Sequence, residues 1–324
     1  MSSGPFALRV GEKFSCIALE NIATDESLNS PVDLHDGFWA LPEPPFGLDD
    51  RWRGWIGSIR SESIDRCNLF LVATLPSKTP DILDGENQQL GRRLNGLFYG
   101  LLLQGLPDHI DGFTLTGART GDQVEIRSMS KLRDHYHSRP KERVRIKAAT
   151  CHVAKSFMEG YEALAASKDF ARFKRGMRAV IRGLREGEVE DRIHEYVRAL
   201  EALVKPEIGA SARQFAHRCM TFTGANEATR RILEDGYAIR SAVEHMHGMA
   251  VALGDYPEGQ HEAIGLTRLR QLEALALGVY LRAVTSSAHG SIFRTDADID
   301  LFWGLRDDER RRAWGTPVTI AGIS

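Results

Sequence analysis

The sequence of 324 residues has no hydrophobic run that approaches the roughly 20 apolar residues needed to span a bilayer. Its first residues also lack the basic segment and apolar core of a secretory signal. The 44 acidic and 42 basic residues give a formal charge of only −2, so no overall field favours a nucleic acid or a membrane. We therefore expect a cytoplasmic protein with no membrane partner.

Cysteine is scarce and widely spaced. Cys16, Cys67, Cys151 and Cys219 are separated by 51, 84 and 68 residues, which matches neither a zinc knuckle nor a disulfide framework. This spacing predicts four free thiols in a reducing compartment. His135 and His137 could begin a metal site if they share one face of a strand, but nothing nearby completes the ligand set. We predict a surface loop there, with no metal and no cofactor.

Proline is nearly absent from the second part of the chain. Nine of the 12 prolines lie at or before Pro140, and three occur in the remaining 184 residues. Because proline is excluded from helix interiors, strands and irregular structure are expected first and helices second. In the first part, hydrophobic patterns predict strands at 14–19 and 68–75, a hairpin of 113–115 with 124–126, and a helix at 88–103.

Six further helices are predicted by apolar spacing, at 145–166, 169–185, 189–204, 210–222, 227–253 and 261–286, with Asp169 as a cap and short turns over 296–314. The expected fold is an α+β N-terminal domain (1–130) followed by an all-α antiparallel helical bundle (148–324). Between them, 131–147 contains seven basic residues and resembles an exposed basic connector. Trp39, Trp52 and Trp55 could line a groove in the first domain or pack in its core.

Acidic residues are missing from the stretch between Phe170 and Arg185, which holds six basic ones. Five arginines recur there at helical spacing, opposite an apolar face: Arg172, Arg175, Arg178, Arg182 and Arg185. Guanidinium groups grip phosphates through paired hydrogen bonds, so this row predicts RNA binding. A solvated helix face is the alternative.

A second cluster combines arginine, glutamate and histidine. On a straight helix, Glu244 lies about 40° and His247 about 20° around the axis from Arg240, whereas His245 lies about 140° away. Such a group forms either a charge network or a reactive site. Upstream, Glu201 lies within an apolar helix face. It is either buried beside an arginine, which burial of its carboxylate would require, or placed at the edge of the helix.

These residues resemble a known family. Arg240-x4-His245, with His247-Gly248 just beyond, is similar to the R-x4–6-H motif of the HEPN superfamily. Tyr237-x-x-Arg240-Ser241 followed by His-Gly resembles the Apea-like HEPN family in particular. The resemblance covers roughly residues 150–290. The shorter motif favours His245 as the family histidine and straight-helix geometry favours His247, so both are retained.

The resemblance implies a metal-independent endoribonuclease in a homodimer or higher homo-oligomer, acting in antiphage defence, abortive infection or stress as a toxin. Histidine would be the general base and Arg240 the phosphate stabiliser, leaving 2′,3′-cyclic phosphate ends. Ser241, Glu244 and Tyr237 would support them, and the first domain would sense a protein or phage-derived trigger. The alternative is a non-catalytic helical module that binds RNA or protein.

Overall fold

The computed structural model describes residues 6–47, 50–105, 110–137, 145–207 and 209–323. The chain divides into two compact units. A sheet unit comprises Met1–Leu102, His109–Asp134 and Glu142–Glu162, and a helical unit comprises Leu103–Asp108, His135–Lys141 and Ala163–Ser324. Among the described residues, no helix combines the length and apolar character needed to cross a membrane.

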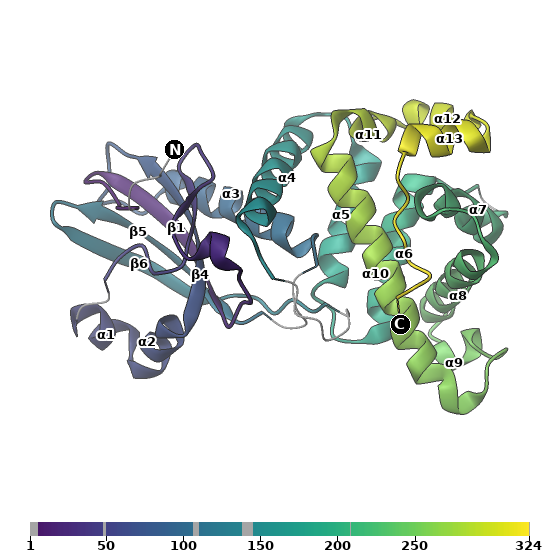
Figure 1. Cartoon of the computed structure of the whole chain (residues 1–324), viewed down its shortest axis with the longest axis horizontal. Coiled ribbons are helices and arrows are strands. Elements are labelled where there is room, and N and C mark those ends of the chain that lie inside the picture. Colours follow the sequence, from purple (N-terminus) through teal and green to yellow (C-terminus); the bar gives the residue numbers. More distant parts are fainter. Residues whose placement is uncertain (1–5, 48–49, 106–109, 138–144, 208, 324) are drawn as a thin grey trace. The chain divides into compact units, whose positions relative to one another are not determined.

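The sheet unit is built on a six-stranded antiparallel sheet in the order β2-β3-β4-β1-β5-β6 (Figure 1). Its strands are β1 (Glu12–Glu20), β2 (Val32–Asp33), β3 (Phe38–Leu41), β4 (Cys67–Pro76), β5 (Gly112–Thr120) and β6 (Gln123–Lys131). The seven central residues of β1 are buried because β4 and β5 flank it and both of its faces are covered.

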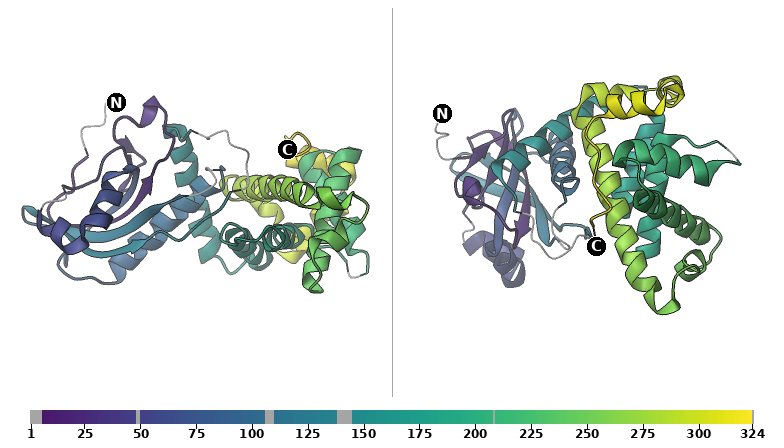
Figure 2. Two further views of the ribbon diagram at one scale, coloured as in Figure 1. Left: turned by 90° about the horizontal axis from the view of Figure 1, so that it is seen from below. Right: turned by 45° about the vertical axis from the view of Figure 1, so that its right-hand side comes forward.

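Helices cover the two faces of the sheet (Figure 2). On one face, Phe14, Cys16 and Ala18 of β1 join a hydrophobic cluster with α1 (Asp50–Ile56) and α2 (Ser58–Asp65). On the other face lies α3 (Gly85–Leu102), where a methyl group added to Gly91 would be 3.9 Å from Ser15 Oγ. The alternation of side chains along β1 thus supplies both cores.

Helix α4 (Ala148–Ala166) packs on α3, although the sequence analysis places it in the helical domain. A methyl group at Gly100 would lie 2.7 Å from Ala154 Cα, so the absence of a side chain lets the two backbones approach closely. Lys155 Nζ also lies 3.2 Å from Asp36 Oδ2. The first compact unit therefore extends to Glu162 rather than ending near residue 130.

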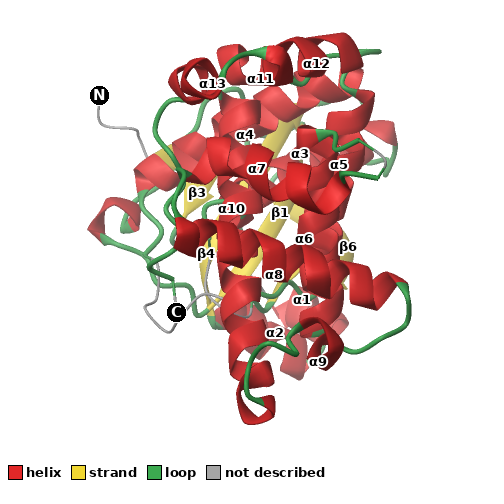
Figure 3. Cartoon of the chain, turned by 90° about the vertical axis from the view of Figure 1, so that its right-hand side faces the viewer, coloured by secondary structure: helices red, strands yellow, loops and turns green. Residues whose placement is uncertain are grey.

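The helical unit contains α5 (Ala171–Gly183), α6 (Val189–Val204), α7 (Ser211–Thr223), α8 (Glu227–Glu244), α9 (Met249–Ala252), α10 (His261–Thr285), α11 (Ser287–Ile292), α12 (Asp296–Gly304) and α13 (Asp307–Trp314) (Figure 3). Helix α6 packs against α5, α8 and α10. Its apolar face is buried from Ile193 to Val204. The order of an α+β part followed by a helical part confirms the coarse fold prediction.

Three local predictions differ from the structure. The helix expected over 227–253 ends at Glu244, and α9 begins separately at Met249. Asp169 is not the cap of α5, because Phe170 occupies that position in a left-handed conformation without a side-chain cap bond. Short helices α12 and α13 replace the turns expected over 296–314.

The expected surface loop with His135 and His137 is wrong for these two histidines, because both are buried. His137 Nδ1 lies 3.1 Å from Glu273 Oε1 of α10, and the backbone of Tyr136 bonds to Leu184 and Arg192. Contacts with the buried side chains of Glu273 and Arg192 therefore attach this short segment to the helical unit. The basic residues of the connector between 138 and 144 lie outside the described residues.

Candidate functional site

Helix α8 carries Arg240 at the edge of its buried face. The helix begins at Asn226, whose side chain accepts a hydrogen bond from the Thr229 N–H over 2.8 Å. Ile232 and Ile239 turn inward, which leaves Arg240 at the rim of the packed face. The cap at Asn226 and the buried isoleucines therefore determine the position of α8, from which the Arg240 guanidinium reaches α6.

The guanidinium of Arg240 is held by two carboxylates. Its Nη1 donates to Glu244 Oε2 over 2.6 Å and its Nη2 donates to Glu201 Oε2 of α6 over 3.0 Å. The Tyr237 ring centroid lies 5.6 Å from its Cζ, within cation–π range. The structure thus brings Tyr237, Glu244 and Glu201 around the Arg240 guanidinium, and of the two positions open to Glu201 it shows the one beside an arginine.

Burial and charge act in opposite directions on this cluster. The side chains of Arg240 and Glu201 are each 18% exposed. Burial raises the pKa of Glu201, the Glu244 carboxylate adds to that rise, and Arg240 opposes it. The pKa of Tyr237 is also raised, first by burial and then by Glu201. Arg240 Nε is buried and finds no acceptor in the described part of the chain. Arg240 therefore supplies the positive charge that compensates the partly buried carboxylate of Glu201.

The helix ends immediately after this cluster through a Schellman motif. The Met246 N–H donates to the Val243 carbonyl over 3.0 Å and the His247 N–H donates to the Ala242 carbonyl over 2.9 Å. Met246 adopts φ 59° and is 94% exposed. The straight-helix argument that favours His247 therefore does not apply, because the chain has left the helix before that residue.

His245 and His247 are both exposed at this helix end. Within the described residues, neither imidazole forms a hydrogen bond or an ion pair with another side chain. Ser241 is half-buried, and its carbonyl accepts the His245 N–H over 3.3 Å. The structure thus places both candidate histidines in solvent, five and seven residues after Arg240, and no hydrogen bond or ion pair among the described residues joins either imidazole to Arg240.

A different histidine joins the cluster. His194 of α6 has its Nε2 3.5 Å from Glu244 Oε1, and its side chain is 19% exposed. His194 is not among the residues predicted for this site, although its spacing from Glu201 indicates a shared helix face. His194 and Glu201 are seven residues apart, which puts them about 20° from each other around one helix.

The arginine row of α5 is divided by the structure. Arg172, Arg175 and Arg182 line a cavity of about 340 Å³ together with Arg198 of α6. Arg178 is exposed and does not line it, and Arg185 lies beyond the end of α5, where its Nε is 3.5 Å from His135 Nε2. Three of the five predicted arginines, Arg172, Arg175 and Arg182, therefore form a cavity wall. The fourth arginine of this wall, Arg198, belongs to α6 and not to the predicted row.

Acidic residues from other helices partly neutralise this wall. Arg182 donates to both oxygens of Glu195, at 2.9 and 2.8 Å, and Arg172 Nε lies 3.4 Å from Asp296 Oδ1. The absence of acids within α5 is thus compensated across the fold. Arg175 is exposed and pairs with no carboxylate among the described residues.

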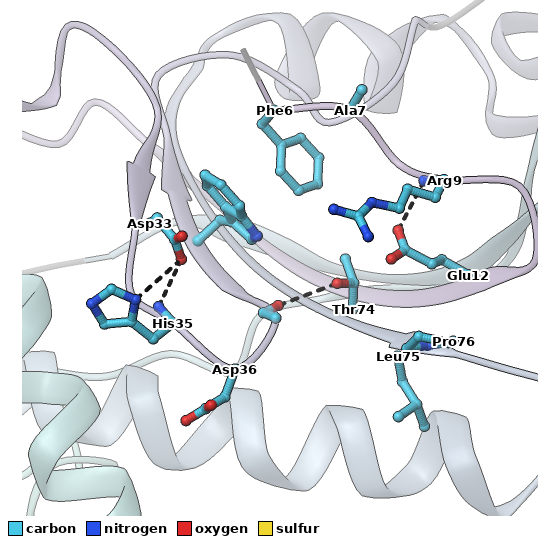
Figure 4. A pocket seen from close by; sticks show the side chains of 12 residues that line it. Phe6, Ala7, Arg9, Glu12, Asp33, His35, Asp36, Thr74, Leu75 and Pro76 are labelled. Carbon is cyan, nitrogen blue, oxygen red and sulfur yellow. Dashed lines mark hydrogen bonds and ion pairs between the residues drawn. The ribbon is translucent and has the colours of Figure 1, made fainter. Parts of the chain in front are cut away.

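The sheet unit has a separate cavity of about 870 Å³ (Figure 4). Phe6 and Trp39 meet edge to face there, with ring centroids 5.2 Å apart, and Arg9, Asp33 and His35 supply charged or polar groups. Its volume is within the range of small-molecule sites. We call it the Trp39 cavity.

The other two tryptophans of the first part do not line this cavity. Trp52 is buried and donates from Nε1 to the Val124 carbonyl over 3.0 Å, whereas Trp55 is 58% exposed. Trp52 therefore belongs to the core, and Trp39 both lines the cavity and packs against the same hydrophobic cluster.

No three histidine, cysteine, aspartate or glutamate side chains of the described residues gather into a metal site. All four cysteines are buried free thiols, as predicted. No family model, curated protein or solved structure matches this chain. The chemistry of the clusters is therefore the basis on which a function is assigned.

Proposed function

We propose that the helical unit is a metal-independent endoribonuclease of HEPN type, with Arg240 as the phosphate-binding residue. The observation that carries the proposal is the position of Arg240: its guanidinium is partly exposed, and five and seven residues later the chain presents two exposed imidazoles, His245 and His247. An arginine that stays charged and a histidine that titrates near neutrality are the two groups that RNA cleavage without a metal requires.

In the proposed reaction, the histidine accepts the proton of a ribose 2′-hydroxyl as that oxygen attacks the adjacent phosphorus. The bond from phosphorus to the 5′-oxygen breaks, and this oxygen takes a proton from water, to which the histidine then returns the proton that it accepted. Arg240 stabilises the charge on the phosphoryl oxygens. The products carry a 2′,3′-cyclic phosphate and a 5′-hydroxyl. Because Glu201 and Glu244 hold Arg240 in the free chain, the phosphate replaces one of these carboxylates.

A homodimer completes the site in this proposal. His245 and His247 bind no side chain in the described residues of one chain, so they are available to a cleft formed with a second copy. Sedimentation in the presence and absence of RNA tests this assembly. A strictly monomeric enzyme with full activity would contradict it.

The experiment that tests the function is RNA cleavage in excess chelator, followed by sequencing of the RNA ends. Arg240→Ala is expected to lower the rate by about 10²- to 10³-fold, and the double change His245→Ala with His247→Ala by about 10²- to 10⁴-fold. The single changes decide between the two histidines. Arg231→Ala is the matched control, because Arg231 lies on the same helix and pairs with Asp235 and Asp255 instead. Equal cleavage by all variants would eliminate the site.

A non-catalytic RNA-binding or protein-interaction module is the second candidate. The network of Glu201, Arg240, Glu244 and His194 favours it, because these contacts stabilise the packing of α6 on α8 without any substrate. In that case Arg240→Ala lowers the melting temperature, and the wild type shows no chelator-resistant cleavage for the substitution to remove.

The sheet unit is proposed as the sensor in the cytoplasm, with the Trp39 cavity as the site for a protein or phage-derived trigger. The cavity offers an aromatic surface at Trp39 and charged groups of both signs at Arg9 and Asp33. Trp39→Ala should abolish the response to phage infection in cells and leave RNA cleavage by the purified protein intact. Trp55→Ala, an exposed tryptophan outside the cavity, is the control and should respond normally.

A further inference from the structure

Two cavities of the helical unit adjoin along α5. The first, of about 340 Å³, lies between α5 and α6. The second, of about 290 Å³, lies at the start of α5 and is lined by Lys168 and Arg294 among others. Arg172 and Arg175 line both, so the two cavities adjoin at these two side chains. We call the two cavities together the arginine groove.

The arginine groove is predominantly basic. Its walls contain six cationic side chains, Lys168, Arg172, Arg175, Arg182, Arg198 and Arg294, against three carboxylates, Asp169, Asp296 and Glu201. Glu195, which pairs with Arg182 and Arg198, and Asp298, which pairs with Arg294, offset part of this charge, so the local excess is carried mainly by Lys168 and Arg175. Arg175 is central because it lines both cavities and pairs with no carboxylate of the described residues. Such a concentration of arginines is suited to a chain of phosphates.

The shape of the groove favours a single strand over a duplex. Ala179 and Ala202 lie among the lining residues of the larger cavity and have small side chains, whereas the place of a side chain on Gly176 is occupied by the Tyr280 hydroxyl. A flexible strand can lay successive phosphates into such a recess, whereas the phosphates of a duplex lie on a stiff convex surface. The cavities are each close to the lower end of the volume range of ligand sites, consistent with one or two nucleotides apiece.

Glu201 connects the groove to Arg240. Its side chain lines the larger cavity, and its Oε2 accepts the hydrogen bond from Arg240 Nη2 over 3.0 Å. A phosphate bound beside Arg198 would face this carboxylate, and the like charges repel each other. Displacement of Glu201 releases one face of the Arg240 guanidinium at the same moment that a phosphate arrives.

We infer that the arginine groove binds the backbone of a single-stranded RNA and leads it to Arg240, with Glu201 as the gate residue between them. The inference rests on the proposed function for its ligand and adds the path of the strand. Recognition through phosphates carries no base preference, so binding is expected to be independent of sequence.

The test uses a labelled single-stranded 20-mer of 2′-O-methyl RNA, which cannot be cleaved because it has no free 2′-hydroxyl. Its affinity is measured by fluorescence anisotropy for the wild type, Arg175→Ala and Arg178→Ala. Arg178 is the matched control, because it is exposed on the same helix and lines neither cavity. Arg175→Ala is expected to weaken binding about tenfold, the effect of one charge-assisted contact, and Arg178→Ala by less than about threefold.

Salt dependence supplies a second readout. Four phosphate contacts on a single strand predict a slope of about −2.8 in log K against log salt, which is a loss of roughly 50-fold between 50 and 200 mM. Arg175→Ala should reduce the steepness by about 0.7. Glu201→Gln removes the repelling charge at the end of the groove and should tighten binding. Unchanged melting temperatures for Arg175→Ala would show that lost affinity is not lost folding.

Equal affinities for Arg175→Ala and Arg178→Ala would overturn the inference, as would a duplex that binds as tightly as the single strand. The two proposals fail separately. If the probe binds through Arg175 but RNA is not cut, the enzyme assignment fails and the groove stands. If RNA is cut through Arg240 but Arg175→Ala binds normally, the groove fails and the enzyme stands.

Discussion

Removal of the Glu273 carboxylate is expected to destabilise the helical unit severely. This side chain is fully buried on α10, where it receives Arg192 Nη2 at 2.6 Å and the Tyr196 hydroxyl at 3.4 Å, and lies 3.1 Å from His137 Nδ1. Glu273→Ala leaves the Arg192 guanidinium, itself only 7% exposed, without its counter-charge. Breaking a buried pair from one side costs about 3–5 kcal/mol, because the remaining charge stays desolvated.

For a unit of this size, each kcal/mol corresponds to about 2–4 °C, so the melting temperature should fall by roughly 6–20 °C. The measurement is urea unfolding followed by far-ultraviolet circular dichroism, which the helices dominate. Asp300→Ala is the control, because it breaks an exposed ion pair with Lys205 and should cost less than about 1 kcal/mol. If the free energies of unfolding of the two variants differ by less than about 1 kcal/mol, the buried network around Glu273 does not stabilise the helical unit in this way.

Three further predictions concern other parts of the chain. Burial raises the pKa of Cys67 and of Cys151 to about 12, so Ellman's reagent should react slowly with the native protein at pH 8 and with four thiols after unfolding; rapid native reaction would contradict this burial. The pKa of Glu201 is raised, so its ionised form is disfavoured in the folded state above the unfolded pKa of about 4.3. Glu201→Gln should therefore be at least as stable as the wild type at pH 7 and equal to it near pH 3, and a less stable variant at pH 7 would refute the sign. Gly100→Ala should cost about 1–3 kcal/mol because its methyl group meets the Ala154 backbone, whereas Gly91→Ala on the same helix should not lower the melting temperature.

Hydrophobic periodicity predicted the long elements well because tertiary contacts and local pattern agree there. Strands β1 and β4 and helices α3, α6 and α10 lie within a few residues of their expected positions. The hairpin of β2 and β3 and the two short helices α1 and α2 were not predicted. These elements are brief, and the prolines and tryptophans around them gave no clear period.

The arginine cluster was partly predictable for a similar reason. The pairing of Arg240 with Glu244 is one that helical spacing allows, whereas the sequence left open whether Glu201 is buried beside an arginine or lies at the helix edge. The end of α8 was missed because the left-handed position that closes it holds Met246, where glycine is the usual signal. The counter-charges of the α5 arginines come from Glu195 and Asp296 on other helices, which no pattern within α5 can reveal.

The packing of α4 against α3 has a practical consequence for cutting the protein into pieces. A fragment that starts at residue 148 carries away the helix whose Ala154 rests on Gly100, and a fragment that stops at residue 130 leaves that glycine surface bare. Either piece would display an apolar strip to other molecules and invite aggregation. Limited proteolysis should accordingly spare the chain between Ala148 and Glu162 for as long as the sheet survives.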